Sequence, residues 1–433
     1  MRKITALSMS LLLIFALFGC QLSNIPKGAQ LVSSYTIVVG ADADIFERDT
    51  AELLQDYITS LTQIELEIRE DSAAAAEYEI FVGDTSRSAE YDTQSLANDE
   101  YYIVSDGNKI SLGGNKHMIA AAAGELAREY VEASKEQFIL RASDIPVTVT
   151  PKKIEYKEAR NIILMIGDGM GFEHINAAKF EGMEEFYAEN LFCGESITTS
   201  LTGVTDSAAG ATAIACGYKT TNKTLGLDGE DRPVKNIREL SQELGKKTGI
   251  VTTDTQIGAT PSAFLVHLIS RNSPDILSAQ SDVKLDYFKH YVTDEGILNS
   301  VKEGLRTVND SENGFFMMIE DDKMDSGGHG FYPPSVVIGI NRFNENIAYN
   351  MCFAAMYPDT ILIVTADHET GGVTFSEKEK KYVCTTSEHT GVNVPVFAMG
   401  FGTEYFSNAT VDNTDIAKFM ARSFGVEDFG QQG

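Results

Sequence analysis

The chain has 433 residues, of which 43% are hydrophobic, so it is long enough for two or three domains with substantial cores. Its formal net charge of −28 argues against a nucleic-acid partner, because binding to a phosphate backbone needs a basic surface. A small anionic substrate remains compatible with this charge if bound metal ions reverse the field locally.

The N-terminus has the organisation of an export signal. Two basic residues precede an apolar run at 11–18, which is too short to span a membrane, and Cys20 follows this run. This order predicts a signal peptide at 1–19 and a bacterial lipoprotein with a lipidated tether at 20–32, so membrane contact is expected only through the lipid anchor. Phe18 replaces the small residue that is usual in such signals. Ordinary secretion to the periplasm or the extracellular space is therefore the alternative.

Four cysteines remain after the signal. They are Cys193, Cys216, Cys352 and Cys384. An even number in an oxidising compartment permits disulfides, but three pairings are possible and no pairing is predicted.

Residues 33–150 are predicted to form an accessory α/β domain, a small sandwich with a mixed or antiparallel sheet. Strands are expected at 35–39, 64–68 and 78–82, a hairpin at 101–112, and helices at 50–61 and 118–130. The order of these elements weakly resembles the accessory domain that precedes the barrel of several glycoside hydrolases, which implies either sugar contact or a packing role. Residues 151–159 are expected to be a linker.

In the remaining part, polar residues recur where apolar strands end. Asp168 follows the run at 161–167, and similar runs lead into Glu320 and into Asp367 with His368. Alternating strands and helices predict a mostly parallel sheet with helices on both faces. Ligands bind such sheets outside the carboxyl ends of the strands, where these side chains would gather.

Ser207 is predicted to lie at a helix N-terminus, because a run of small helix formers begins directly behind it. Free N–H groups and the helix dipole favour an anionic oxygen at that position. The alternative is that Asp206 or Ser207 only caps the helix.

The candidate ligands are chemically suited to divalent metals. Imidazole with carboxylate suits zinc, and an all-oxygen set suits magnesium or calcium. Asp325 and His329 are expected in a glycine-rich loop, and a helical stretch beginning near residue 259 is expected to end at Arg271. His174 and His267 are interpreted as packed or supporting residues, and Glu369 as solvated.

Over residues 160–425 the sequence resembles the alkaline phosphatase family. The similarity rests on NIILMIGDGMG at 161–171, VTDSAAGATA at 204–213, GATPSAFLVHLISR at 258–271, the spacing of Glu320, Asp325 and His329, IVTADHETGG at 363–372, and EHTG at 388–391. The resemblance implies that residues 160–425 are a catalytic domain of that fold.

The resemblance also implies a set of site residues. One Zn²⁺ would be held by Asp325, His329 and His389, and a second by Asp168, Asp367 and His368, with Ser207 bridging to it. One Mg²⁺ would be held by Asp168, Thr260 and Glu320. Arg271 would bind the substrate.

The implied activity is hydrolysis of small phosphate monoesters by double displacement through a phosphoserine at Ser207, with a homodimer left open. The alternatives are a phosphodiesterase or sulfatase on the same scaffold, or a glycan-binding surface lipoprotein whose second domain is inactive. Arg271 disfavours the diesterase, because a bidentate clamp suits a dianionic monoester.

Three departures from the family pattern affect these expectations. Gly258 stands where many relatives have an acidic residue or histidine that supports the magnesium waters, so the third metal is expected to bind weakly or differently. Ser326 replaces a larger side chain beside a zinc ligand, which implies weaker retention of phosphate. The stretch at 272–313 is shorter than usual, which leaves the pocket wall and the oligomer interface undefined.

Overall fold

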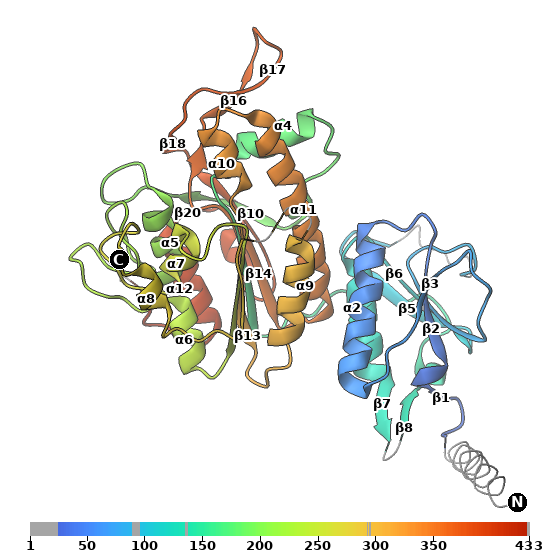
Figure 1. The fold of residues 1–433 in the computed structure, drawn as a ribbon. Helices are drawn as coiled ribbons and strands as arrows, with labels where there is room; N and C mark the ends of the chain where they lie inside the picture. The colour runs from blue at the N-terminus through green and yellow to red at the C-terminus, as the bar shows by residue number, and fades with distance from the viewer. Residues whose placement is uncertain (1–24, 89–95, 135–136, 292, 294–295, 431–433) are drawn as a thin grey trace, which may run out of the picture. The chain divides into compact units, whose positions relative to one another are not determined.

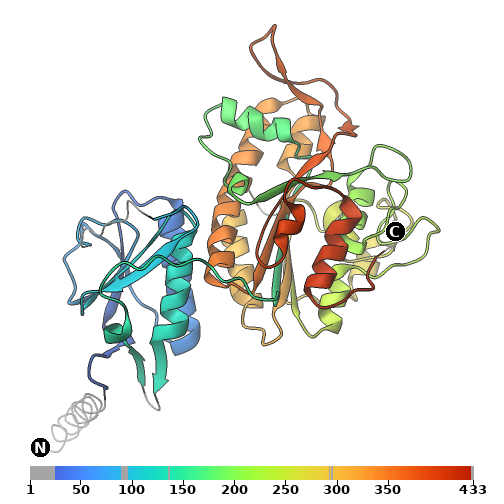
Figure 2. The ribbon, with the colours of Figure 1, turned by 180° about the vertical axis from the view of Figure 1, so that it is seen from behind.

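The computed structural model divides the chain into two compact units, Met1–Ile154 and Glu155–Gly433 (Figures 1 and 2). The residues that it describes are 25–88, 96–134, 137–291, 293 and 296–430. The predicted signal peptide and Cys20 lie outside these residues. Within them, no helix has both the length and the apolar character needed to cross a bilayer. All four cysteines named above are free thiols.

The first unit contains a five-stranded sheet with the order β3-β2-β4-β6-β5. Its neighbouring strands are parallel except for the β5–β6 hairpin, so the predicted mixed α/β architecture is confirmed. Helices α2 and α3 pack side by side (Figure 2). The bounds are β2 (Tyr35–Val39), α2 (Ile45–Thr62), β3 (Ile68–Glu70), β4 (Tyr78–Val82), β5 (Tyr101–Ser105), β6 (Lys109–Gly114) and α3 (Met118–Glu125). A small second sheet has the order β1-β8-β7, with β1 (Gln30–Leu31), β7 (Val131–Ser134) and β8 (Gln137–Leu140).

Two predicted elements of this unit differ from the structure. The strand expected at 64–68 begins only at Ile68, because side chains of α2 bind the carbonyl oxygens before it. Thr59 donates to the Ile64 carbonyl at 3.2 Å, and Gln55 donates to that of Leu66 at 2.6 Å. The helix expected at 118–130 changes into a π-helical turn after α3.

The second unit contains an eight-stranded sheet with the order β12-β11-β13-β9-β14-β19-β10-β20. The five strands from β12 to β14 in this order are parallel to one another, and β19 is antiparallel to both of its neighbours, so the mostly parallel sheet is confirmed. The strands are β9 (Asn161–Gly167), β10 (Phe192–Ile197), β11 (Lys247–Thr252), β12 (Tyr287–Lys289), β13 (Phe315–Asp321), β14 (Thr360–Thr365), β19 (Val394–Met399) and β20 (Thr410–Asp412).

Helices cover both faces of this sheet (Figure 1). One group of helices includes α9 and α11, and the other includes α5, α7 and α12. The helices are α4 (Phe172–Phe180), α5 (Ser207–Cys216), α6 (Ile237–Glu243), α7 (Ala259–Ala263), α8 (Ile276–Gln280), α9 (Ile297–Val308), α10 (Lys323–His329), α11 (Pro333–Met356) and α12 (Asn413–Ser423). The short stretch at 272–313 therefore supplies α8, the edge strand β12 and α9.

The register of the central strands brings their carboxyl ends to one level. Glu320 on β13 pairs with Ile166 on β9, and Thr365 on β14 pairs with the same residue from the other side. The segments that follow these strands therefore leave the sheet at the same edge. Two short pairs lie beyond β14, β15 (Glu369–Thr370) with β18 (His389–Thr390) and β16 (Val373–Ser376) with β17 (Lys381–Cys384).

Candidate metal centre and nucleophile

Ser207 is the first residue of α5, as predicted, and Asp206 is the residue that caps the helix. The Asp206 side chain accepts a hydrogen bond from the Ala209 N–H at 3.0 Å. The Ser207 hydroxyl is thus not needed as a cap, and its Oγ lies 3.2 Å from His368 Nε2. Gly210 permits this approach, since a Cβ there would lie 2.8 Å from the Asp367 carbonyl oxygen.

Asp325 and His329 lie on α10, not in the loop predicted for them. Their separation of four residues places both side chains on one face of this helix. Packing makes the helix possible, because Gly328 lies directly against Thr370 and any Cβ at Gly328 would be 2.6 Å from the Thr370 carbonyl oxygen. Gly328, one of the two glycines that suggested a loop, therefore allows a close contact between α10 and β15.

The first candidate metal group consists of Asp325, His329 and His389, whose ligand atoms all lie within 4.8 Å of one another. The two Nε2 atoms are 3.1 Å apart, and the Asp325 oxygens are 3.4 Å from His329 Nε2 and 3.5 Å from His389 Nε2. Two nitrogen ligands of one tetrahedral zinc, at about 2.0–2.1 Å each, would be separated by about 3.3 Å. The spacing of this group therefore fits a shared zinc ion.

Backbone carbonyl groups fix the orientation of both rings. His389 Nδ1 lies 2.9 Å from the Thr205 carbonyl oxygen, and His329 Nδ1 lies 2.5 Å from that of Ser387. A carbonyl oxygen only accepts, so each Nδ1 carries the proton and each Nε2 presents a lone pair to the site. Such outer contacts are typical of metal-binding histidines.

The second candidate group surrounds His368 Nε2, which lies 3.3 Å from Asp367 Oδ2 and 3.7 Å from Asp168 Oδ1. Neither of these carboxylate oxygens has a hydrogen-bond partner, although both are buried. Unpartnered buried carboxylate oxygens are costly, and a bound cation would relieve that cost. Asp325 belongs to this group as well, since its ligand atom lies within 4.8 Å of those of Asp168 and His368.

Thr370 joins the two groups and was not predicted from the sequence. Its hydroxyl donates to Asp325 Oδ1 at 2.5 Å and lies 3.1 Å from His368 Nδ1. Because that hydroxyl proton goes to the carboxylate, the Thr370 oxygen accepts from His368 Nδ1–H. The third ring therefore also presents Nε2 to the site. The position of Thr370, two residues after His368 on an extended segment, is the one sequence signal that could have indicated this role.

An all-oxygen group lies beside the second metal group. The Thr260 hydroxyl is 3.5 Å from Asp168 Oδ2, and Glu320 Oε2 accepts from the Thr252 hydroxyl. Glu320 is fully buried, and its Oε1 has no hydrogen-bond partner. These oxygens fit the preference of Mg²⁺ for hard ligands.

Arg271 reaches the same site from a loop. The helix expected to end at Arg271 stops at Ala263, because Leu268 forms a reciprocal backbone pair with Leu225 at 2.8 Å. Arg271 N–H then donates to the Lys223 carbonyl oxygen at 2.7 Å. This loop, rather than a helix, sets the direction of the guanidinium.

A pocket of about 660 Å³ opens over these residues. It is lined by Asp168, Ser207, Arg271, Asp325, His329 and His389 from the predicted set and by Val204, Thr205, Asp206, Asn222, Asp254, Asp322 and Glu388. Sequence reasoning missed Asp254 and Asp322. Their positions were the available signal, because Asp254 lies two residues after the end of β11 and Asp322 lies directly after β13. The same argument from strand ends identified Glu320.

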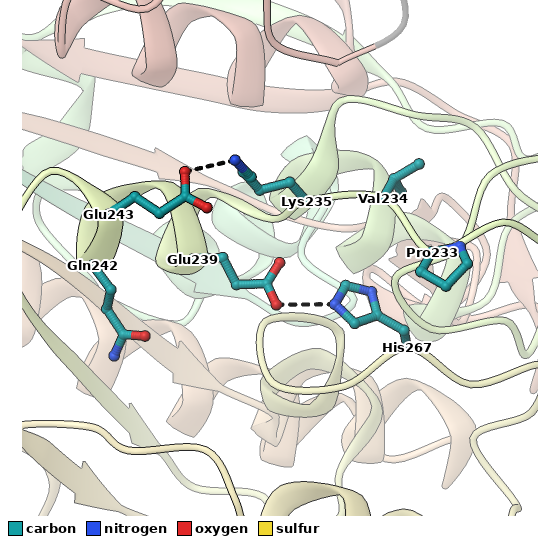
Figure 3. Close-up of a pocket in the computed structure, with 7 residues that line it drawn as sticks. All are labelled: Pro233, Val234, Lys235, Glu239, Gln242, Glu243 and His267. Carbon is teal, nitrogen blue, oxygen red and sulfur yellow. Dashed lines mark hydrogen bonds and ion pairs between the residues drawn. The ribbon is translucent and has the colours of Figure 1, made fainter.

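His174 and His267 were interpreted as packed or supporting residues, and their surroundings agree with this interpretation. His174 is fully buried. His267 belongs to a separate pocket of about 570 Å³, where its Nε2 lies 3.0 Å from Glu239 and its Nδ1 lies 2.7 Å from the Gly226 carbonyl oxygen (Figure 3).

Glu369 was predicted to be solvated, which is wrong. It is buried because it accepts hydrogen bonds from the Val373 N–H and the Thr390 hydroxyl, which hold β15.

Burial and crowding of like charges shift the pKa values of the site. Burial, followed by the charge of Asp325, raises the pKa of Asp367 to about 7. Burial and then the charge of Asp367 raise the pKa of Asp168 well above its usual value. Burial lowers the pKa of His368 well below its usual value, so this ring is neutral and can act as a ligand.

The His389–Asp325 pair shifts in the opposite sense to burial. Burial would lower the pKa of His389, but the hydrogen bond and charge of Asp325 raise it. Burial would likewise raise the pKa of Asp325, but the hydrogen bonds with His389 and Thr370 lower it. In the absence of metal, a proton on His389 therefore balances the negative charge of the Asp325 carboxylate. A bound cation would take over this role.

These shifts predict that metal removal destabilises the protein more at pH 8 than at pH 5.5. For a carboxyl group whose folded pKa is raised, the stabilising contribution is present below the unfolded pKa of about 4 and is lost as pH rises through the folded value. For Asp367 this loss runs from about pH 4 to about pH 7, so it is complete at pH 8 and only partial at pH 5.5, and His389 has the same sign. Metal would replace these protons, and its binding strengthens as the ligands deprotonate.

The measurement is the melting temperature of metal-loaded and chelator-stripped protein at both pH values. The difference between the two forms should be larger at pH 8. Asp367→Asn should flatten the pH dependence of the stripped protein. An equal or larger difference at pH 5.5 would contradict the assignment of these groups as ligands that exchange protons for metal.

Both the sequence and the fold of this chain are similar to those of known proteins. A family model described as alkaline phosphatase matches residues 159–297 and 277–384. Alkaline phosphatase 4 of Bacillus subtilis is 28% identical over 303 residues, which cover 53% of this chain and 66% of the relative. Repressible alkaline phosphatase of Saccharomyces cerevisiae is 26% identical over 320 residues, which cover 51% of this chain and 56% of the relative. The chain thus spans less than two thirds of the length of these relatives.

Solved structures agree with the fold of the second unit. Alkaline phosphatase from the Antarctic bacterium TAB5 aligns with a TM-score of 0.58 and 25% identity, covering 62% of this chain and 99% of that chain. A mutant of the TAB5 enzyme with Mg bound in its M3 site aligns with a TM-score of 0.57 and 24% identity, covering 64% of this chain and all of the other. The predicted fold class is confirmed.

Proposed function

Because the chain belongs to the alkaline phosphatase family, we propose that it hydrolyses phosphate monoesters through a phosphoserine at Ser207, with two zinc ions bound. The observation that carries this proposal is the position of the Ser207 hydroxyl. It lies at the N-terminus of α5, 3.2 Å from His368 Nε2, and lines the pocket that also contains Arg271, the first metal group and Asp168 of the second.

The chain's own residues account for most of the reaction. Bound zinc would lower the pKa of the Ser207 hydroxyl and neutralise charge on the leaving oxygen. Ser207 Oγ attacks phosphorus, the bond to the leaving alkoxide breaks, and water then cleaves the phosphoserine to release phosphate. Arg271 can bind two nonbridging phosphoryl oxygens bidentately. The N-terminus of α5 favours the negative charge that collects around Ser207.

Zinc is proposed for the two histidine-containing groups and Mg²⁺ for the all-oxygen group. The first group would use Asp325, His329 and His389. The second would use Asp168, Asp367 and His368, with Asp325 close enough to contribute to both. Thr260, Glu320 and Asp168 would hold Mg²⁺, the metal described in the M3 site of the TAB5 mutant.

Phosphodiesters and sulfate esters are the competing substrates on this scaffold. A diester has only two free nonbridging oxygens and one negative charge. Arg271 could bind these oxygens, but a monoanion would be attracted less strongly than a dianion to the three cations, which are Arg271 and the two proposed zinc ions. We therefore favour dianionic monoesters. Among the described residues of the first unit, no feature supports the glycan-binding alternative over a catalytic role for the second unit.

The test compares hydrolysis of a chromogenic phosphate monoester with that of the matching diester and sulfate. Metal-reconstituted protein should turn over the monoester fastest, and a chelator should stop the reaction. Faster hydrolysis of the diester or the sulfate would overturn the substrate class. Absence of turnover on every ester, in folded protein that holds zinc, would overturn the enzymatic proposal.

Export and lipid attachment at Cys20 are proposed from the sequence alone. Expression of the full chain in a bacterium should give a membrane-associated protein with a mass increase on the Cys20 peptide. Cys20→Ser should release the protein into the soluble exported fraction. Retention of the variant in the membrane fraction would contradict lipid anchoring.

A further inference from the structure

Gly258 precedes α7 and has no side chain, yet the space beside it is filled. A Cβ built on Gly258 would lie 1.9 Å from Asp254 Oδ2. The backbone does not require glycine at this position, because its φ of −52° and ψ of 152° are accessible to any residue. The Asp254 carboxylate therefore occupies the volume that a side chain of residue 258 would enter.

The turn between β11 and α7 directs Asp254 to this position. Asp254 N–H donates to the Thr252 hydroxyl oxygen at 2.9 Å, and Asp254 Oδ1 accepts from the Thr255 N–H at 2.5 Å. The turn closes where the Gly258 N–H donates to the Thr255 carbonyl oxygen at 2.9 Å. Thr252 also donates its hydroxyl proton to Glu320, so one short network joins Asp254 to the all-oxygen group.

A buried carboxylate oxygen indicates that a cation belongs beside this turn. Glu320 Oε1 has no hydrogen-bond partner, although Glu320 is fully buried. Asp254 is half-buried and lines the same pocket as Asp168. It is thus placed on the solvent side of the group, where metal-bound water would lie. Magnesium usually keeps several of its waters and needs outer groups to hold them.

We propose that Asp254 takes the place of the absent residue 258 side chain and holds water ligands of a magnesium ion bound by Asp168, Thr260 and Glu320. Asp254 is then a positioning residue, which acts on the metal through water. This inference rests on the metal assignment of the proposed function. From the sequence, Gly258 was expected to leave the third metal site weak or altered. The inference instead makes Asp254 the source of the carboxylate that Gly258 lacks.

The test measures Mn²⁺ binding to zinc-loaded protein by electron paramagnetic resonance, with Mg²⁺ as the competitor. Asp254→Asn should lower the Mn²⁺ affinity about 10- to 100-fold, the usual effect of losing an outer-shell partner, while zinc content is unchanged. The matched control is Asp322→Asn, which removes the same charge from the same pocket. The Asp322 carboxylate accepts from the Thr253 hydroxyl at 2.5 Å, so this variant should stay close to wild type.

A rescue experiment tests the exchange of positions. Gly258→Asp alone should clash with Asp254 and fail to strengthen Mn²⁺ binding. Asp254→Ala with Gly258→Asp should bind Mn²⁺ more tightly than Asp254→Ala alone, because the new carboxylate enters the vacated volume. The Cβ of residue 254 would remain 3.1 Å from the new Cβ, which requires only a small shift. Melting curves verify that each variant is folded.

Wild-type Mn²⁺ affinity in Asp254→Asn would overturn the inference, as would an equal loss in Asp322→Asn or a double variant no better than Asp254→Ala. These readouts do not depend on turnover. Protein that hydrolyses monoesters while Asp254→Asn binds Mn²⁺ normally would refute the role of Asp254 and leave the proposed function intact. Protein that hydrolyses no ester, while Asp254→Asn weakens Mn²⁺ binding as expected, would refute the proposed function and retain the metal site.

Discussion

Ser207→Ala should abolish phosphoenzyme formation and lower kcat for monoester hydrolysis by about 10⁴-fold or more, the scale seen when the nucleophile of a covalent mechanism is removed. The reason is that no other hydroxyl occupies its position, at the N-terminus of α5 and 3.2 Å from His368 Nε2. Zinc should remain bound, because Asp168, Asp367 and His368 still surround the second position.

The measurement combines acid-quenched mass spectrometry of the Ser207 peptide with metal analysis and steady-state rates. Ser326→Ala is the matched control. Ser326 lies on α10 near the site, but its hydroxyl donates to the Lys323 carbonyl oxygen at 3.2 Å. This control should keep both the phosphoenzyme and most of the activity. A stable phosphoenzyme in Ser207→Ala would exclude Ser207 as the nucleophile, whatever the activity.

The sequence was sufficient wherever one short stretch determines the structure. The runs at 35–39, 78–82 and 161–167 match β2, β4 and β9 residue for residue, because continuous β-branched and apolar residues specify buried strands. Residues at the ends of adjacent parallel strands then had to meet at one edge. This topology alone predicts that Asp168, Glu320 and the Asp367–His368 pair lie close together.

Prediction failed where packing between distant segments decides the outcome. Gly327 and Gly328 are poor helix formers, but α10 forms because Gly328 permits contact with Thr370 and Gly327 permits contact with Val336. The apolar run before Arg271 has helical character, yet its backbone pairs with Leu225. The burial of Glu369 depends on Thr390, which lies farther along the chain. The position of Asp254 depends on a turn that has no periodic sequence pattern.

Asp325→Asn should remove most of both zinc ions, whereas Asp367→Asn should remove about one, if the site holds about two as in other two-metal centres. Asp325 is the residue that the structure includes in both candidate groups, together with His329 and His389 in one and with Asp168 and His368 in the other. An amide keeps the volume of the carboxylate but removes the negative charge that both positions share. Asp367 lies only at the second position, beside His368 Nε2 at 3.3 Å.

Zinc content after dialysis at a fixed free-zinc concentration is the measurement, with the melting temperature of the stripped variants as a check on folding. Asp325→Asn should also lower the pKa of His389, because the hydrogen bond and charge of Asp325 are what raise it. Nuclear magnetic resonance titration of the stripped protein would detect that change independently of metal. If Asp325→Asn loses the same amount of zinc as Asp367→Asn, Asp325 serves a single metal. Its proximity to the second group would then reflect only the crowding of ligands between two adjacent ions.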